Sequence, residues 1–235
     1  LKKSNKNQDS GNIYLKWLGV SQLEDSIETN VFLEKIDTDW LIVDHYSLDT
    51  IWENQVRENV KKILIIDDLA NRNHTCNVLL DQNWFENPKS RYHNLVQKDT
   101  KMLLGPKFAL LRMEFRNARS NVNLKKNDIK RMFIFFGGSD PENMTKVTCK
   151  VLFESIFSSY QFDIVVGGSY GHLKELKSLL DKKSNFNLIV QTNNISKYML
   201  KADLAIGGAG VNTWERMALG LPSLIISFAE NHTIL

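Results

Sequence analysis

The sequence predicts an α/β protein built on parallel sheets, and three observations lead to that class. Short apolar runs recur along the second half of the chain, and most of them end at glycine or at a polar residue. Segments with helical spacing of apolar residues separate these runs. Glycine turns connect several of the runs to the helices. Strands that alternate with helices are typical of a doubly wound parallel sheet.

The elements of the second half follow one another with short connections. We expect a helix from Asp140, a favourable N-cap with proline at the next position, to about Phe157. A leucine-rich helix begins at Leu173. The apolar runs predict strands, and the segments after them predict two more helices. These strands are expected at residues 131–136, 162–166, 186–190, 204–206 and 223–227, and the helices at 195–201 and 213–219.

The first half shows the same alternation less completely. Strands are expected at residues 40–44, 63–67 and 78–80, with a helix from Asp49 to Val60. So few strands indicate that the beginning of this domain is absent, and the missing initial methionine indicates a piece of a longer protein. Residues 116–128 are polar without apolar periodicity and are interpreted as a connection. We therefore divide the chain into an incomplete domain (1–116), a linker (117–128) and a second domain (129–235).

Composition narrows the classes of function. The chain has 235 residues, 43% hydrophobic and 24% charged, as expected of a globular protein. Its net charge of +3 argues against a dedicated nucleic-acid surface. Cys76 and Cys149 lie far apart, which argues against a disulfide framework or a zinc site and favours a reducing, cytoplasmic location. No apolar run approaches the ~18 residues of a membrane span, and no signal peptide is recognised.

The stretch from Leu204 to Glu215 is the most informative motif. An apolar strand runs into the sequence Gly-Gly-Ala-Gly, and a helix with a carboxylate in its first turn follows. Glycines admit a phosphate close to the backbone, and the helix N-terminus favours an anion. A carboxylate there can accept hydrogen bonds from a ribose diol. Two alternatives need no ligand: a plain connecting turn, or a capping box between Asn212 and Glu215.

Other polar residues also follow the predicted strands. Tyr46 is either a site residue or a half-buried tyrosine with its hydroxyl in solvent, and His45 is interpreted as structural. In the pair Asp67 and Asp68, one carboxylate is expected to cap the next turn while the other is solvated. Further alternatives are a metal site from Asp68, His74 and Cys76, anion contacts by Arg112 and Arg116, and packing roles for Trp52 and Trp214.

Several motifs together resemble one known family. They lie at residues 17–22, 44–46, 67–74, 105–115, 137–140 and 213–215. In this order they are similar to the UDP-2,4-diacetamido-2,4,6-trideoxy-β-L-altropyranose hydrolases of pseudaminic acid biosynthesis. The resemblance covers nearly the whole chain. It implies two Rossmann-like domains of the GT-B type facing each other across a cleft, as in the lipid II type of cell-wall glycosyltransferase.

The resemblance implies hydrolysis of a UDP-linked sugar at its anomeric carbon, with release of UDP and no metal or cofactor. It implies a supporting active-site role for Tyr46 and UDP binding by the second domain. The implied substrate-binding residues are Gly138, Ser139, Gly208, Ala209, Gly210, Thr213, Glu215, Asn231 and His232. Among them, the 208–210 amides would meet the phosphates, and the Glu215 carboxylate would bind the ribose.

Two departures from the family pattern matter. The general base of the family is a histidine in a glycine-rich loop at the start of the fold, which this sequence lacks, so the base is expected upstream of Leu1. The residue after Asn231 is His232, where the family usually has glutamine. Two alternatives therefore stay open: a UDP-sugar-dependent glycosyltransferase, and a UDP-binding fragment without catalysis.

Overall fold

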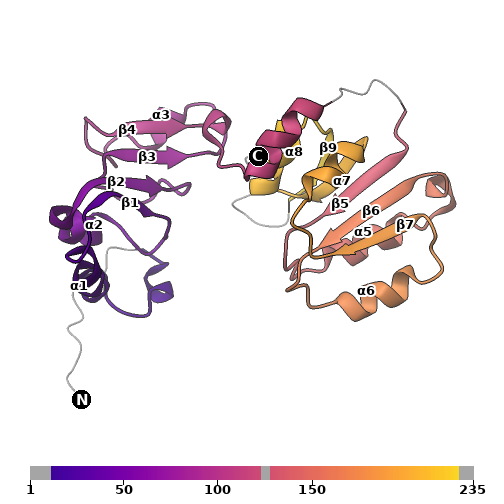
Figure 1. Ribbon diagram of the computed structural model, residues 1–235, viewed down its shortest axis with the longest axis horizontal. Coiled ribbons are helices and arrows are strands. Elements are labelled where there is room, and N and C mark those ends of the chain that lie inside the picture. The colour runs from indigo at the N-terminus through magenta and orange to yellow at the C-terminus, as the bar shows by residue number, and fades with distance from the viewer. Residues whose placement is uncertain (1–11, 123–127, 228–235) are drawn as a thin grey trace, which may run out of the picture. The chain divides into compact units, whose positions relative to one another are not determined.

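The computed structural model describes residues 12–122 and 128–227, and the chain divides into two compact units. Unit 1 is Leu1–Ala109 and unit 2 is Leu110–Leu235, and Figure 1 shows the strands and helices of each. All strand pairings between described residues are parallel. The predicted parallel α/β class is therefore confirmed in both units.

Unit 1 holds a four-stranded sheet in the order β1-β2-β3-β4. Its strands are β1 (Thr38–Val43), β2 (Val60–Ile66), β3 (Val78–Asp81) and β4 (Lys101–Leu104). Its helices are α1 (Gln22–Leu33), α2 (Thr50–Val56) and α3 (Pro88–Arg91), with 3₁₀ turns at Leu15–Trp17, Arg57–Asn59 and Pro106–Phe108. The sequence did not predict α1 or β4.

Helices α1 and α2 pack on the core of unit 1. The Asp49 carboxylate accepts a hydrogen bond from the Ile51 N–H at 2.9 Å, so the predicted N-cap of α2 is confirmed. The helix ends at Val56 rather than at Val60, because a 3₁₀ turn intervenes before β2. Buried side chains such as Val56 and Ile63 join these helices to the sheet.

Unit 2 holds a five-stranded sheet in the order β7-β6-β5-β8-β9. Its strands are β5 (Arg131–Phe135), β6 (Gln161–Val166), β7 (Phe186–Val190), β8 (Leu204–Gly208) and β9 (Ser223–Ile226). Its helices are α4 (Met113–Ala118), α5 (Met144–Val151), α6 (Leu173–Leu180), α7 (Ser196–Lys201) and α8 (Val211–Ala218), with 3₁₀ turns at Arg119–Asn121 and Ser155–Phe157. Each strand predicted here is present.

Helices cover both faces of the sheet in unit 2. Side chains alternate along β5: Ile134 packs on the face that carries α5 and α6, and Phe133 packs on the face that carries α4 and α7. Both side chains are fully buried. The apolar runs of β5 and β6 are continuous because both of their faces are covered. Unit 2 is therefore a three-layer, Rossmann-like α/β unit.

The helix predicted at 140–157 is shorter than expected. Its N-cap is Asn143, and it ends at Val151. The Asp140 carboxylate still accepts hydrogen bonds from the backbone N–H groups of Met144 and Thr145, both at 2.9 Å. The residue acts on the helix terminus as expected, but a left-handed residue (Asn143, φ 53°) delays the start of the helix.

The observed division of the chain differs from the predicted linker. Helix α4 packs against α7 and α8, and its Phe115 is fully buried in the core of unit 2. Part of the predicted linker is also structured, since Ala118 is buried and a 3₁₀ turn follows it. No helix among the described residues combines the length and apolar character needed to cross a bilayer.

Candidate functional site

The candidate site of unit 2 lies at the carboxyl ends of its strands. The chain order reverses between β5 and β8, which are neighbours in the sheet although two strands separate them in sequence. Open parallel sheets bind ligands beyond the carboxyl ends of strands at such a switch point. The loops after β5, β6 and β7 and the turn before α8 all begin at this edge.

A cavity of about 280 Å³ opens at this edge of the sheet. Gly167 shows how closely the loops after β5 and β6 approach each other. A Cβ atom there would lie 2.3 Å from the Gly138 carbonyl oxygen, so only glycine fits. The lining residues are Arg112, Phe135, Gly138, Val165, Val166, Gly167, Gln191, Thr192, Ile195, Asn212 and Glu215.

The Glu215 carboxylate is the charged group that α8 contributes to the cavity. The residue is 3% exposed. Its Oε1 accepts a hydrogen bond from Arg112 Nε at 3.0 Å and forms an ion pair with Arg112 Nη2 at 2.9 Å. Its Oε2 is buried and has no partner among the described residues. Burial raises the pKa of Glu215 above its ordinary value, and the charge of Arg112 offsets part of that rise.

The capping-box alternative for Glu215 is wrong. Helix α8 has Gly210 as its N-cap and receives no side-chain cap there, and Asn212 already lies inside the helix. Glu215 bonds to Arg112 instead of reaching back to the start of the helix.

Unsatisfied buried atoms concentrate on α8. Seven buried side-chain atoms of the described residues lack a hydrogen-bond partner, and four of these belong to Trp214, Glu215 and Arg216. Native proteins leave few such atoms, and each requires an explanation such as a bound ligand. Three consecutive residues of α8 thus carry most of the unpaired buried side-chain atoms of the described residues.

The turn between β8 and α8 has the geometry of an anion-binding loop. Gly210 has φ +112° and ψ −162°, a conformation that side-chain-bearing residues avoid. Ala209 and Gly210 are both half-buried in this turn. Free amides before a helix N-terminus attract anions.

The structure separates the predicted substrate-binding residues into groups. Gly138 and Glu215 line the cavity, and Ser139 is exposed on the same loop as Gly138. The buried Thr213 hydroxyl accepts a hydrogen bond from Arg216 Nη2 at 3.2 Å. Gly208, Ala209 and Gly210 form the turn before α8, and Asn231 and His232 lie outside the described residues.

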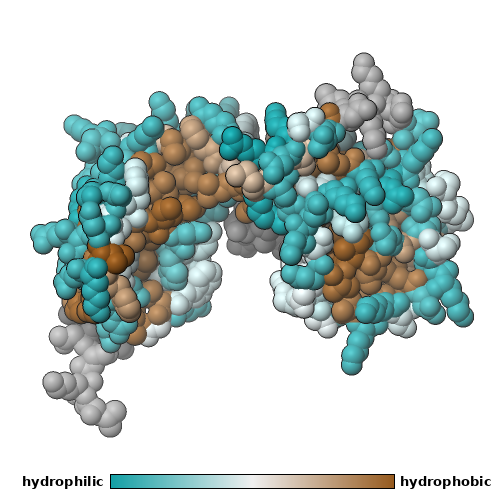
Figure 2. Space-filling view, viewed as in Figure 1, coloured by the Kyte–Doolittle hydropathy of each residue, from teal (hydrophilic) through white to brown (hydrophobic). Residues whose placement is uncertain are grey.

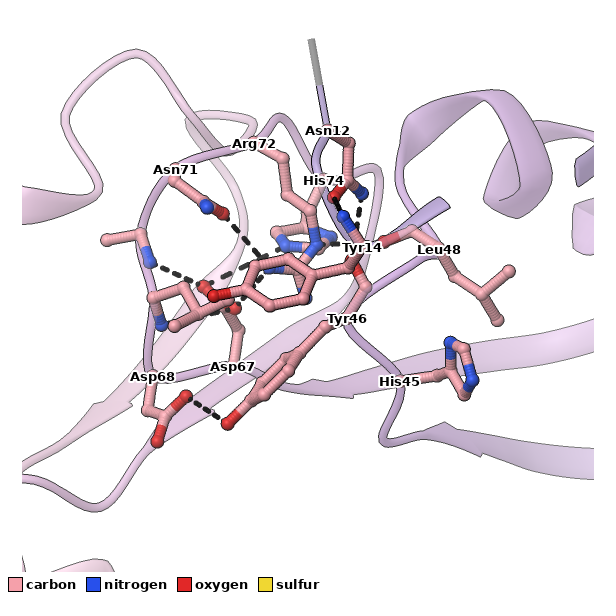
Figure 3. A network of polar contacts seen from close by, with 12 residues as sticks. Asn12, Tyr14, His45, Tyr46, Leu48, Asp67, Asp68, Asn71, Arg72 and His74 are labelled. Atoms are coloured by element: carbon pink, nitrogen blue, oxygen red, sulfur yellow. Dashed lines mark hydrogen bonds and ion pairs between the residues drawn. The ribbon is translucent and has the colours of Figure 1, made fainter. Parts of the chain in front are cut away.

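Tyr46 of unit 1 points toward a carboxylate rather than into solvent (Figure 3). Its hydroxyl donates to Asp68 Oδ1 at 2.8 Å. Partial burial and the nearby Asp68 raise the pKa of Tyr46 well above its ordinary value. The phenol oxygen keeps its lone pairs available to accept a hydrogen bond. Asp68 is therefore not simply solvated, as predicted, but holds the tyrosine in place.

The neighbouring polar residues of unit 1 bond mostly to one another, although His74 Nε2 is buried without a hydrogen-bond partner among the described residues. Asp67 Oδ1 accepts from the Leu69 N–H at 3.4 Å and Oδ2 from the Ala70 N–H at 3.0 Å, so this carboxylate caps the following turn as predicted. Its Oδ1 also pairs with Arg72 at 2.8 Å. His74 Nδ1 contacts Glu53 Oε1 at 2.6 Å. His45 Nδ1 accepts from a backbone N–H in its own loop, in agreement with its structural interpretation.

The structure also bears on the alternatives raised for the possible metal site, the cysteines and the tryptophans. Within residues 12–122 and 128–227, no group of histidine, cysteine and carboxylate side chains is arranged to hold a metal ion. Cys76 and Cys149 are buried free thiols. Trp52 and Trp214 are buried, as their predicted packing role requires.

Sequence reasoning left two arginines, Arg112 and Arg216, out of the predicted site. Arg112 was considered for anion contacts, but nothing in the sequence linked it to a carboxylate about a hundred positions later. Arg216, which follows Glu215 directly, received no role. Its burial beside a glycine turn could not be inferred, because arginine is usually exposed.

Comparison with known proteins agrees with this architecture. Residues 132–234 match the glycosyltransferase family 28 C-terminal domain. The uncharacterised protein MJ1062 of Methanocaldococcus jannaschii is 27% identical over 83% of this chain and 41% of its own length. The spore coat polysaccharide biosynthesis protein SpsG of Bacillus subtilis is 30% identical over 59% of this chain and 41% of its own length. The chain thus spans about two fifths of these relatives.

Two solved structures resemble the chain at low sequence identity. Acinetobacter baumannii MurG is 13% identical with a TM-score of 0.48, over 90% of this chain and 59% of that protein. The glycosyltransferase WaaG, which takes part in lipopolysaccharide biosynthesis, is 14% identical with a TM-score of 0.40, over 74% of this chain and 62% of that protein.

Proposed function

We propose that unit 2 binds the UDP portion of a nucleotide sugar and that the whole protein hydrolyses this sugar at its anomeric carbon. The proposed substrate is a UDP-linked 2,4-diacetamido-2,4,6-trideoxy hexose, and the products are UDP and the free sugar for pseudaminic acid biosynthesis. The sugar and the pathway enter through the resemblance of the motifs. The match of residues 132–234 to a glycosyltransferase domain supports a nucleotide-sugar ligand.

The observation that carries the proposal is the unsatisfied oxygen of Glu215. A carboxylate that is 3% exposed, with Oε1 held by Arg112 and Oε2 unpartnered among the described residues, faces a cavity at the switch point. A ribose diol donates two hydrogen bonds, and a carboxylate can accept both. Binding would therefore satisfy the orphaned Oε2 while Arg112 keeps the carboxylate in position.

The diphosphate would bind at the turn before α8. The N–H groups of Ala209 and Gly210 and the N-terminus of this helix supply hydrogen bonds and a positive potential to an anion. The same contacts would stabilise UDP as it leaves, because negative charge grows on the diphosphate while the bond to the sugar breaks. Ser139 lies on the loop next to Gly138 and completes the proposed phosphate side.

The reaction itself needs water, a base and room for the sugar. The water oxygen bonds to the anomeric carbon as the bond to the diphosphate oxygen breaks. UDP leaves with the bonding electrons, and the base takes the proton of the water. We assign the base to a histidine in a segment that precedes Leu1 in the parent protein. Tyr46, held by Asp68, would accept a hydrogen bond from the sugar or the water.

The second candidate function is glycosyl transfer to an acceptor alcohol. The match to a glycosyltransferase domain favours it, since that domain is shared by enzymes that use an alcohol in place of water. The nucleotide site is the same in both cases, so unit 2 does not separate the two reactions. The predicted cytoplasmic location of either enzyme stays a prediction.

UDP release by the full parent protein tests the reaction. A hydrolase releases UDP from the nucleotide sugar at the same rate with and without an added acceptor. A transferase stays nearly silent until the acceptor is present, which would contradict hydrolysis. Tyr46→Phe should lower the rate without changing UDP affinity, and Tyr160→Phe serves as the control tyrosine in unit 2. If the 235-residue chain binds UDP but turns over nothing, it is the binding fragment.

A further inference from the structure

Arg216 is a buried cation beneath the turn between β8 and α8. It is 1% exposed and is one of the largest fully buried side chains. Its Nη2 donates to the Gly208 carbonyl oxygen at 2.9 Å and to Thr213 Oγ1 at 3.2 Å. Its Nε and Nη1 have no acceptor within the described residues. A Cβ atom at Gly207 would lie 3.0 Å from Nη1, so the guanidinium packs against the end of β8.

The charge of Arg216 is not neutralised by an ion pair with any described carboxylate. The neighbouring Glu215 forms its ion pair with Arg112 instead. Burial lowers the pKa of Arg216 to about 10, and the guanidinium still carries its charge at neutral pH. Keeping an unpaired charge in the interior is costly, and an apolar side chain of similar volume would often be at least as stable. Packing alone does not explain an arginine at this position.

The hydrogen bond from Arg216 to Gly208 fixes the direction of the next amide. In a planar trans peptide, the carbonyl of one residue and the N–H of the following residue point in opposite directions. Because the Gly208 carbonyl points toward the buried guanidinium, the Ala209 N–H must point away from it. The register of β8 with β9 places this N–H on the side of β9, so the hydrogen bond from Arg216 holds the end of β8 in position before the turn.

We propose that Arg216 is a positioning residue for the diphosphate of the bound nucleotide. It holds the Gly208–Ala209 peptide in place at the start of the turn, and it places an unneutralised positive charge behind the turn that the diphosphate compensates. This inference rests on the proposed UDP site but adds a residue to it. Arg216 touches the turn and not the ligand, so it acts on phosphate affinity through the backbone and through its charge.

Separate titrations with UDP and with uridine test this role on the full chain. Uridine has the ribose and the base but no phosphates, so it reports on the Glu215 side of the site alone. Arg216→Met should weaken UDP binding by about tenfold or more, as expected for a lost charge-assisted interaction, with uridine affinity changed by less than about twofold. Loss of both affinities in equal measure, or of neither, would overturn the inference.

Two further variants separate a loss of UDP affinity from a loss of stability. Leu219→Ala removes a core side chain (4% exposed) directly after α8, and it should lower the melting temperature while leaving the ratio of UDP to uridine affinity unchanged. Arg216→Lys keeps the charge but loses the planar guanidinium donors. If Arg216→Met does not fold, Arg216→Lys should still weaken UDP selectively, and unchanged UDP affinity in it rejects the inference. If the wild-type chain binds neither probe, the proposed function itself fails.

Discussion

The two units of this chain differ in how completely their buried polar groups are paired. In unit 1, Asp67, Arg72, His74 and Glu53 bond to one another and to the backbone, close to Tyr46. In unit 2, the residues around Glu215 keep buried donors and acceptors unpaired in the described structure. Within the unit 1 network only His74 Nε2 lacks a hydrogen-bond partner among the described residues, whereas Trp214, Glu215 and Arg216 together leave four such atoms. Buried polar atoms without partners are costly, and a ligand that bonds to them removes that cost. This difference supports our proposal that the nucleotide binds in unit 2.

The units also differ in how they cover apolar surface. Both faces of the unit 2 sheet carry helices, but β1 of unit 1 exposes Trp40 and Ile42 at 46% and 63%. Helix α1 exposes Leu23, Ile27 and Val31, which are spaced by four residues and form one stripe. Figure 2 shows apolar residues gathered over the strands of unit 1. Exposed apolar patches of this kind mark contact surfaces.

Removing the central carboxylate of the unit 1 network should give the largest effect on stability. Glu53 is fully buried and bonds to His74 Nδ1 and to the Thr75 N–H. Glu53→Ala leaves both groups unpaired, and we expect a loss of about 3 kcal/mol in the free energy of unfolding of unit 1. Denaturant titration should show this shift without any change in UDP affinity. An equally large effect of the exposed control Glu86→Ala would contradict the assignment.

The pH dependence of UDP binding tests whether Glu215 must be ionised to bind the nucleotide. Burial raises the pKa of the Glu215 carboxyl above its usual 4.5. UDP affinity should therefore fall on acidification at a pH above 4.5, because the protonated carboxyl no longer accepts the ribose hydrogen bonds as a carboxylate. Arg112 lowers that pKa, so in Arg112→Ala the fall should begin at higher pH. UDP titrations between pH 4 and 8 measure this. The Glu215→Gln protein serves as the control for protonation of the phosphate itself. An unchanged pH profile in Arg112→Ala would contradict the claim that Arg112 lowers the pKa of Glu215.

A substitution on the open face of unit 1 should have the smallest effect on folding. Ile42→Lys places a charge on β1 at a side chain that is 63% exposed, so we expect a change within about 0.5 kcal/mol. Light scattering measures self-association, and any self-association through this apolar patch should decrease because the new charge interrupts the patch. A strong loss of stability would mean that the Ile42 side chain is covered in solution.

The sequence predicted the sheet of unit 2 better than that of unit 1. Strands such as β5 and β6 are continuous apolar runs because both faces are buried, and such runs are easy to recognise. Strand β4 (Lys101–Leu104) has a short apolar run beside charged residues, and the apolar stripe of α1 is exposed rather than packed. Local patterns do not reveal either element.

The sequence likewise predicted only part of the candidate site. The glycine turn and Glu215 could be read from the sequence, because a strand, a turn and a helix follow one another within a dozen residues. The ion pair between Arg112 and Glu215 could not, because it depends on how α4 packs against α8. The link between Tyr46 and Asp68 likewise depends on the parallel pairing of β1 with β2, which brings their carboxyl ends together.

Calorimetric titration of UDP into three proteins tests the central claim, namely that the unsatisfied carboxylate of α8 holds the nucleotide. The proteins are the wild-type chain, Glu215→Ala and Glu175→Ala, whose lost carboxylate lies on the exposed surface of α6. We predict that Glu175→Ala binds UDP like the wild type and that Glu215→Ala binds it about ten- to a hundredfold more weakly, the loss of a charged hydrogen bond. Equal UDP affinity in all three proteins would contradict the claim.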